Sequence, residues 1–146
     1  RRSDGSTAVA DLMGMPNGST GETVPDTSIY AEPNRNVITK RDVPMVFQTY
    51  AEVRLLKAEM AFRGWSVPGD AKTHYEAGVK AAMQMLSSIY PNAAAISDAE
   101  VDAYLALKPY DASKGWEMIS EQYWAATLLN EYEAFSNWRR TGFPTR

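Results

Sequence analysis

The 146-residue sequence is 45% hydrophobic, 11% aromatic and 23% charged. This composition argues against intrinsic disorder, and the length suits one domain with a hydrophobic core. Fifteen Lys and Arg against eighteen Asp and Glu leave a net charge of −3, which argues against a nucleic-acid partner because phosphate binding needs a cationic face.

The residue types that usually carry chemistry are scarce. The sequence has no Cys, which excludes disulfides, thiol nucleophiles and Cys-bound metals. Its one His, His74, lacks the neighbours of a metal site or a catalytic triad, so we interpret it as an exposed or locally bonded residue on a helix surface. No apolar stretch approaches the ~20 residues that cross a bilayer. We therefore expect no catalytic residue, no metal site and no cofactor.

Residues 1–44 have the composition of a loop, with four Gly, four Pro and apolar residues that follow no period. Such a long irregular run is uncommon in a self-contained domain, so we expect its structural neighbours to lie outside this chain. Tyr30, Asn34 and Arg35 cluster in this segment. Because ligand contacts concentrate on loops, these three residues are the candidate ligand-binding residues.

Residues 45–146 have helical periodicity. A first helix is expected from Pro44, which suits a first turn, to about Gly64, with an apolar face. The residues of that face are Phe47, Ala51, Leu55, Ala58, Phe62 and Trp65. A second helix is expected between the capping residue Asp70 and Pro91. The short connection predicts an antiparallel, tetratricopeptide-like helix pair.

Two further helices complete an all-α prediction. Ser97 and Glu100 have capping-box spacing and begin a short helix that ends near Lys108. A long fourth helix is expected from Ser113 to Arg140, ended by Gly142. Five aromatic side chains on the predicted helices are expected in the core: Trp65, Tyr123, Trp124, Tyr132 and Trp138.

Glu52 and Glu59 are the only carboxylates considered for acid chemistry. They are seven residues apart on one predicted helix, or ~10.5 Å along its axis, near the wide end for an inverting glycosidase pair. A catalytic acid and base normally face each other across a cleft, however. We therefore favour a solvated or salt-bridged helix face and keep an all-α glycosidase as the weakest hypothesis.

Three segments together resemble a known family. Residues 49–65, TYAEVRLLKAEMAFRGW, resemble the tyr-ala-glu helix of SusD/RagB-like proteins. Residues 75–79, YEAGV, and 131–144, EYEAFSNWRRTGFP, look like later signatures of the same family, in the same order. These residues are scaffold signatures, and Arg139 and Arg140 are interpreted as helix-end charges that complement the helix dipole.

The resemblance implies a carboxy-terminal portion of a larger all-α SusD-like fold. It further implies a non-catalytic surface lipoprotein of the Bacteroidetes outer membrane that binds a glycan or another nutrient and delivers it to a SusC-type TonB-dependent transporter. Membrane contact would be made through an N-terminal lipid that is absent from this chain. A tetratricopeptide-like adaptor that binds a partner peptide is the alternative.

Overall fold

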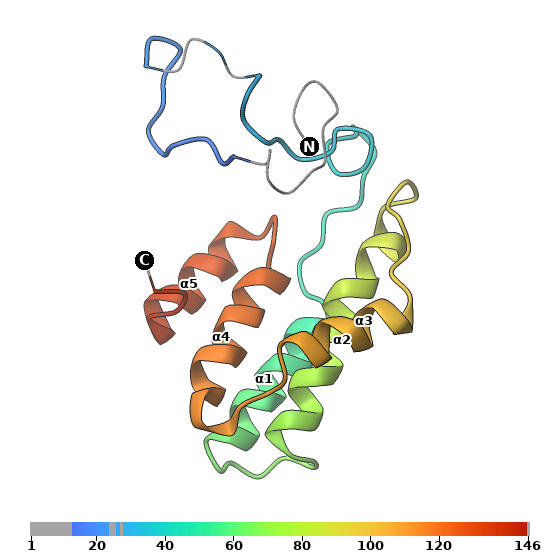
Figure 1. Ribbon diagram of the computed structural model, residues 1–146, viewed down its shortest axis with the longest axis vertical. Coiled ribbons are helices and arrows are strands. Elements are labelled where there is room, and N and C mark those ends of the chain that lie inside the picture. The colour runs from blue at the N-terminus through green and yellow to red at the C-terminus, as the bar shows by residue number, and fades with distance from the viewer. Residues whose placement is uncertain (1–12, 24–25, 27, 146) are drawn as a thin grey trace. The chain divides into compact units, whose positions relative to one another are not determined.

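The computed structural model describes residues 13–23, 26 and 28–145. The chain separates into two compact units, Arg1–Val43 and Pro44–Arg146, here called the loop unit and the helical unit. The described part of the loop unit consists of turns and irregular backbone, with one isolated parallel bridge between Met13 and Tyr30 (Figure 1).

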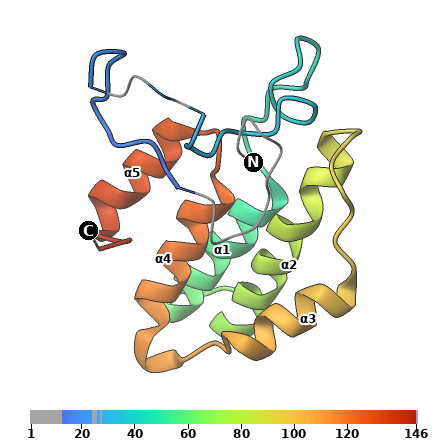
Figure 2. The same cartoon turned by 45° about the horizontal axis from the view of Figure 1, so that its top comes forward.

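The described residues of the helical unit form five α-helices and one short 3-10 turn. In chain order these are α1 (Tyr50–Phe62), α2 (Ala71–Ile89), α3 (Asp98–Leu107), η2 (Ala112–Lys114), α4 (Gly115–Ala126) and α5 (Glu131–Thr141). α1 and α2 lie side by side in both views, and α4 flanks α1 on its other side (Figures 1 and 2). The all-α prediction is confirmed, whereas the tetratricopeptide-like character of the first pair stays a prediction.

α1 begins later than predicted. The helix starts at Tyr50 and not near Pro44, because Thr49 and Glu52 form a capping box. The Thr49 hydroxyl accepts a hydrogen bond from the Glu52 amide at 3.1 Å, and Glu52 Oε1 accepts one from the Thr49 amide at 2.8 Å. These two bonds satisfy amides that the first turn leaves without helical partners, so they fix where the helix starts.

The predicted boundaries of α2 and α3 are confirmed closely. Asp70 caps α2 by accepting a 2.8 Å hydrogen bond from the Thr73 amide, which lowers the pKa of its carboxyl. α2 ends at Ile89, two residues before Pro91. Ser97 and Glu100 form the predicted capping box at the start of α3. In each case a short local pattern in the sequence determines the helix end.

The prediction of a single long helix from Ser113 to Arg140 is wrong, because the structure has two helices there, α4 and α5. The Thr127 hydroxyl donates to the Tyr123 and Trp124 carbonyls at 3.0 Å and so competes with the continuing ladder. Leu129 has a φ of 72°, and the Asn130 side chain caps α5 at the Glu133 amide. Asn130-x-x-Glu133 is a helix-start pattern that the apolar periodicity concealed.

The core lies where α1, α2 and α4 meet. Leu55 of α1 is fully buried, and the backbone at Gly78 of α2 approaches it so closely that a Cβ there would lie 2.7 Å from Leu55 Cγ. The buried residues that form the cluster are Ala51, Leu55, Ala58, Tyr75, Val79, Ile119, Tyr123 and Ala126. Small residues therefore set the spacing between the first two helices.

The predicted burial of the aromatic residues is mostly wrong in the helical unit. Only Tyr123 of the five lies in the core, and Trp138 is half-buried. Trp65, Trp124 and Tyr132 are exposed, Tyr132 to 87% of its full area. Division of the fourth helix changes the direction of α5, so the stripe that would have continued from Trp124 to Tyr132 does not form.

Glu59 connects α1 to the end of α5. The residue is 8% exposed, and its carboxylate accepts a hydrogen bond from Arg63 Nε at 2.9 Å and two from the Arg140 guanidinium, one of them at 2.8 Å. The Trp116 ring of α4 lies 4.5 Å from the Arg63 guanidinium carbon and 5.7 Å from that of Arg140. We call Glu59, Arg63, Arg140 and Trp116 the Glu59 cluster.

The Glu59 cluster is further fixed by Asn137. Arg140 Nη2 donates to the Asn137 side-chain oxygen at 3.1 Å, while the Asn137 amide nitrogen donates to the Ser120 carbonyl of α4 at 3.1 Å. Arg140, interpreted from the sequence as a helix-end charge, therefore has a long-range partner 81 residues away. Three helices converge on one buried carboxylate.

Replacing Gly78 with Ala is expected to lower the free energy of unfolding by about 1–2 kcal/mol. Overpacking against Leu55 costs ~1–3 kcal/mol, and the better helix propensity of Ala returns up to ~1 kcal/mol. Chemical denaturation monitored by circular dichroism measures the change. Gly21→Ala is the control, since a Cβ there meets nothing within 4 Å. Equal stability of the two variants would contradict the close approach.

Arg140→Met is expected to destabilise by about 1–3 kcal/mol, because Glu59 loses two charge-assisted hydrogen bonds. The effect is smaller than for a fully buried pair, since 43% of the Arg140 side chain is exposed. Hydrogen exchange should show the loss of protection concentrated in α5. Arg139→Met, at the neighbouring exposed position, should change stability by less than ~0.5 kcal/mol. The same loss in both variants would refute the role of the pair.

Candidate functional site

The three ligand candidates of the loop unit have local roles in the structure. Asn34 Oδ1 accepts a hydrogen bond from the Asn36 amide at 3.0 Å, and the Asn34 carbonyl accepts from the Val37 and Ile38 amides at 2.9 Å. Arg35 forms a 2.7 Å ion pair with Glu32, with 74% of its side chain exposed. Tyr30 is half-buried at the bridge to Met13. Their role in ligand binding stays a prediction.

His74 is buried and not exposed on the helix surface, although its predicted local bonding is present. Its Nε2 lies 2.7 Å from the Pro68 carbonyl oxygen, so the ring ties α2 to the turn before it. A neutral imidazole makes this bond with Nε2 protonated. Within residues 13–23, 26 and 28–145, no group of three His, Asp or Glu side chains is arranged to hold a metal.

Glu52 and Glu59 both have structural partners. Glu52 is 4% exposed and caps α1, and Glu59 is the centre of the Glu59 cluster. The prediction of a salt-bridged residue holds for Glu59, but neither side chain is solvated. A general acid must reach the oxygen of the leaving group, and each of these carboxylates is instead occupied by protein donors.

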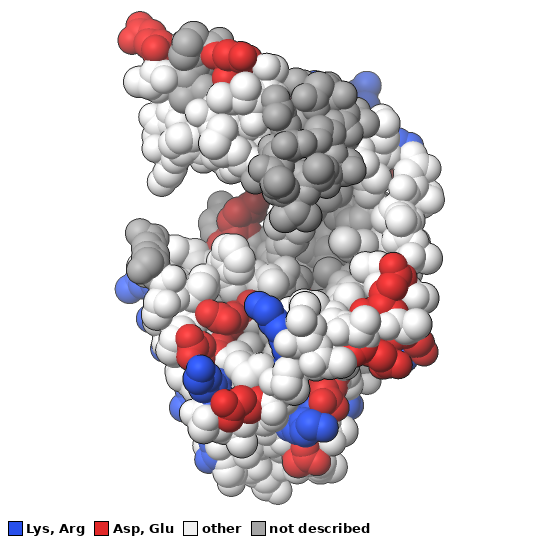
Figure 3. Space-filling model, viewed as in Figure 1, with Lys and Arg blue, Asp and Glu red and all other residues white. Residues whose placement is uncertain are grey.

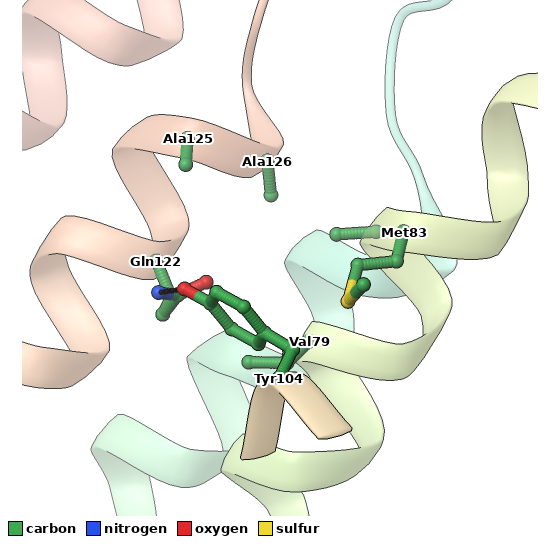
Figure 4. A pocket seen from close by; sticks show the side chains of 7 residues that line it. Val79, Met83, Tyr104, Gln122, Ala125 and Ala126 are labelled. Carbon is green, nitrogen blue, oxygen red and sulfur yellow. Dashed lines mark hydrogen bonds between the residues drawn. The ribbon is translucent and has the colours of Figure 1, made fainter. Parts of the chain in front are cut away.

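An open hollow of about 260 Å³ lies between α2, α3 and α4 (Figure 4). It is lined by Val79, Ala82, Met83, Tyr104, Gln122, Ala125 and Ala126, and is called the α2–α4 hollow below. The Gln122 side-chain amide donates a 2.8 Å hydrogen bond to the Tyr104 hydroxyl. Figure 4 shows this pair at one side of the hollow and Met83, Ala125 and Ala126 around the rest.

The α2–α4 hollow has a lining that could hold a small ligand. Its walls are mostly apolar, with one phenol and one carboxamide that can orient a ligand, which is the usual pattern of small-molecule pockets. None of its lining residues carries a carboxylate, an imidazole or an ammonium group. The helix positions of Tyr104 and Gln122 hold both polar groups in place.

This hollow was not predicted from the sequence. Its signal was the small size of Ala82, Ala125 and Ala126, which leave room where larger side chains would close the gap. Their spacing also fits ordinary helix packing, so the pattern alone does not locate a pocket. Tyr104 and Gln122 are 18 residues apart on different helices, and only the fold brings them together.

A second hollow of about 340 Å³ is lined by charged residues. Its lining is Tyr75, Lys108, Pro109, Asp111, Lys114, Glu117, Met118, Glu121 and Gln122. Burial raises the pKa of Tyr75 to about 12, so its hydroxyl is neutral in the physiological range. Asp111 accepts hydrogen bonds from the Ser113 hydroxyl and amide, which lower the pKa of its carboxyl. Gln122 lines both hollows.

Charges of both signs alternate on the displayed face of the helical unit (Figure 3). The helical unit also has two ion pairs that involve α2: Lys72 with Glu76 at 3.1 Å, and Lys80 with Asp98 at 2.9 Å. The second pair and a hydrogen bond from Gln84 lower the pKa of Asp98 and join α2 to α3. Among the helices that the structure describes, none is long and apolar enough to cross a membrane.

Comparisons with known proteins agree with this fold. A solved chain described as a chitin-binding protein is 44% identical, with a TM-score of 0.67, and the similarity covers 72% of this chain and 23% of that one. A second, described as Bacteroidetes AC2a SusD-like, is 36% identical with a TM-score of 0.67 and coverages of 73% and 21%. The chain thus spans under a quarter of the length of either. No curated protein matches it.

The match to a family model extends over nearly the whole sequence. The model of SusD-like proteins, described as starch-binding and associating with the outer membrane, matches residues 2–145. The chain belongs to the SusD-like family.

Proposed function

We propose that this chain is part of a non-catalytic protein that binds a glycan at the outer membrane and delivers it to a TonB-dependent transporter. The observation that carries the proposal is the family match over residues 2–145, since that family is described as starch-binding and associating with the outer membrane. Similarity to a chitin-binding protein supports a polysaccharide ligand. A surface-exposed lipoprotein paired with a SusC-type transporter is the form in which we expect this function.

The state of the two glutamates supports binding rather than cleavage. Glycosidases need an acid that reaches the glycosidic oxygen and a second carboxylate across the scissile bond. Glu52 is used in a helix cap, and Glu59 is held by Arg63 and Arg140. Releasing either carboxylate for catalysis would break these hydrogen bonds, each of which contributes ~0.5–3 kcal/mol.

Glycan binding is tested with the full-length protein by isothermal titration calorimetry against chitin, starch and cellulose oligosaccharides. We expect saturable binding to at least one of them, and the wild-type protein should release no shorter product during long incubation, as measured by chromatography. Absence of binding to all three glycans would refute the glycan proposal. Product release would contradict the non-catalytic role.

Glu52→Gln separates the structural role of this residue from a catalytic one. We expect a slightly lower melting temperature, because Gln can still complete the capping box but lacks the negative charge that favours a helix N-terminus, at a cost of ~0.3–1 kcal/mol. Glycan affinity measured below the melting temperature should be unchanged. Glu76→Gln, on the exposed side of α2 in an ion pair with Lys72, is the control and should melt within about 1–2 °C of the wild type.

Delivery is tested by extracting the full-length protein from membranes of its native host in mild detergent. We expect a lipid-modified species by intact mass, co-purifying with a TonB-dependent transporter. A soluble, unmodified species without a transporter would contradict the delivery part of the proposal while leaving glycan binding in place.

A further inference from the structure

We infer that the α2–α4 hollow is a subsite for one N-acetylhexosamine unit of the bound glycan, an inference that rests on the proposed function. The hollow combines an apolar space with a polar pair at its side, and these two features match the two halves of an acetamido sugar.

The volume and walls of the hollow fit a single sugar unit. At about 260 Å³ it lies just below the 300–1,000 Å³ of pockets for drug-sized ligands, so it has room for one ring and its substituent. Ala82, Met83, Ala125 and Ala126 provide apolar contacts for the acetamido methyl group and the C–H face of the ring. A hydroxyl at the same ring position would keep the contacts of the C–H face and lose those of the methyl group.

The polar pair provides the complementary hydrogen-bonding groups. Gln122 Nε2 donates to the Tyr104 hydroxyl oxygen at 2.8 Å, which leaves the hydroxyl hydrogen and the Gln122 carbonyl oxygen for other bonds. In the part of the chain that the structure describes, neither of these two groups has a protein partner. An acetamido group offers one N–H and one C=O, so it satisfies the carbonyl of Gln122 and the hydroxyl of Tyr104 together.

Rigidity of the lining adds to the case. Tyr104, Gln122 and Ala125 belong to helices whose positions are set by the core, and the direct bond between the first two orients both. A ligand therefore meets groups that are already ordered, which lowers the entropic cost of binding. The single polar pair at this site distinguishes it from the charged hollow next to it.

The test compares chitopentaose with cellopentaose, which share the β-1,4 backbone and differ in the acetamido group. Calorimetry on the full-length protein should show at least about tenfold tighter binding of chitopentaose. Tyr104→Phe and Gln122→Leu should each weaken chitopentaose binding by about 5–10-fold, one lost hydrogen bond, and leave cellopentaose unchanged. Tyr132→Phe removes an exposed hydroxyl of α5 and should affect neither ligand.

A second variant tests the space itself. Ala125 is exposed and lines the hollow, so Ala125→Trp should fill it without disturbing the core, and the melting temperature reports the integrity of the fold. Chitopentaose binding should fall by at least tenfold. Glycan binding with no preference for chitopentaose, or with affinities unchanged in all three hollow variants, would overturn this inference and leave the proposed function intact. Failure to bind any glycan would overturn both.

Discussion

A buried carboxylate needs partners, and the Glu59 cluster shows how the helical unit supplies them. Transfer of an unpaired carboxylate from water into a protein interior costs several kcal/mol, more than one helix–helix contact returns. Arg63 and Arg140 both donate hydrogen bonds to the Glu59 carboxylate and so compensate for its burial. α5 packs against α4, and the Arg140 side chain extends from its last turn to α1, with the Trp116 ring of α4 beside the guanidinium groups of Arg63 and Arg140. The Glu59 cluster thus joins side chains from α1, α4 and α5.

α4 contacts the Glu59 cluster on one side and lines the α2–α4 hollow on the other. Its Trp116 and Ser120 contact the Glu59 cluster and Asn137, while Gln122 and Ala125 line the α2–α4 hollow. The helical repeat of 3.6 residues directs these pairs to different sides of one rod. A helix fixed on one side by charge and packing presents its other side with little freedom to move. Binding to such a surface would need little reorganisation.

Sequence patterns that act over a few residues predicted much of the fold, whereas contacts between distant residues were not predicted. Asp70, Ser97 and Pro91 act on their immediate neighbours, so their effects on helix ends were readable from the sequence. The pairing of Glu59 with Arg140 depends on how α5 returns to α1, which no short pattern encodes. The division after Ala126 was concealed because apolar spacing continued across Thr127 to Asn130 while their side chains bonded to the backbone.

The candidate site shows the same limit. Tyr30, Asn34 and Arg35 were selected because loops often carry ligand contacts, and the structure gives Asn34 and Arg35 partners within the loop unit. The α2–α4 hollow arises from residues on three helices, and its space results from side chains that are small. A sequence displays the side chains that are present, whereas a cavity depends on volume left unfilled after helices pack.

A small rotation at the connection between α4 and α5 displaces the far end of α5. Leu129, with a φ of 72°, sets the direction in which α5 leaves, and Arg140 lies near the far end of that helix. Ten residues of rise separate Asn130 from Arg140, a length of ~15 Å. A rotation of α5 by ~10° at this connection would move the Arg140 guanidinium by ~2.6 Å. A hydrogen bond tolerates a displacement of only a few tenths of an ångström. A small change in the backbone angle at Leu129 thus produces a large displacement at the end of α5. The length and conformation of the four-residue connection therefore determine whether Arg140 can reach Glu59.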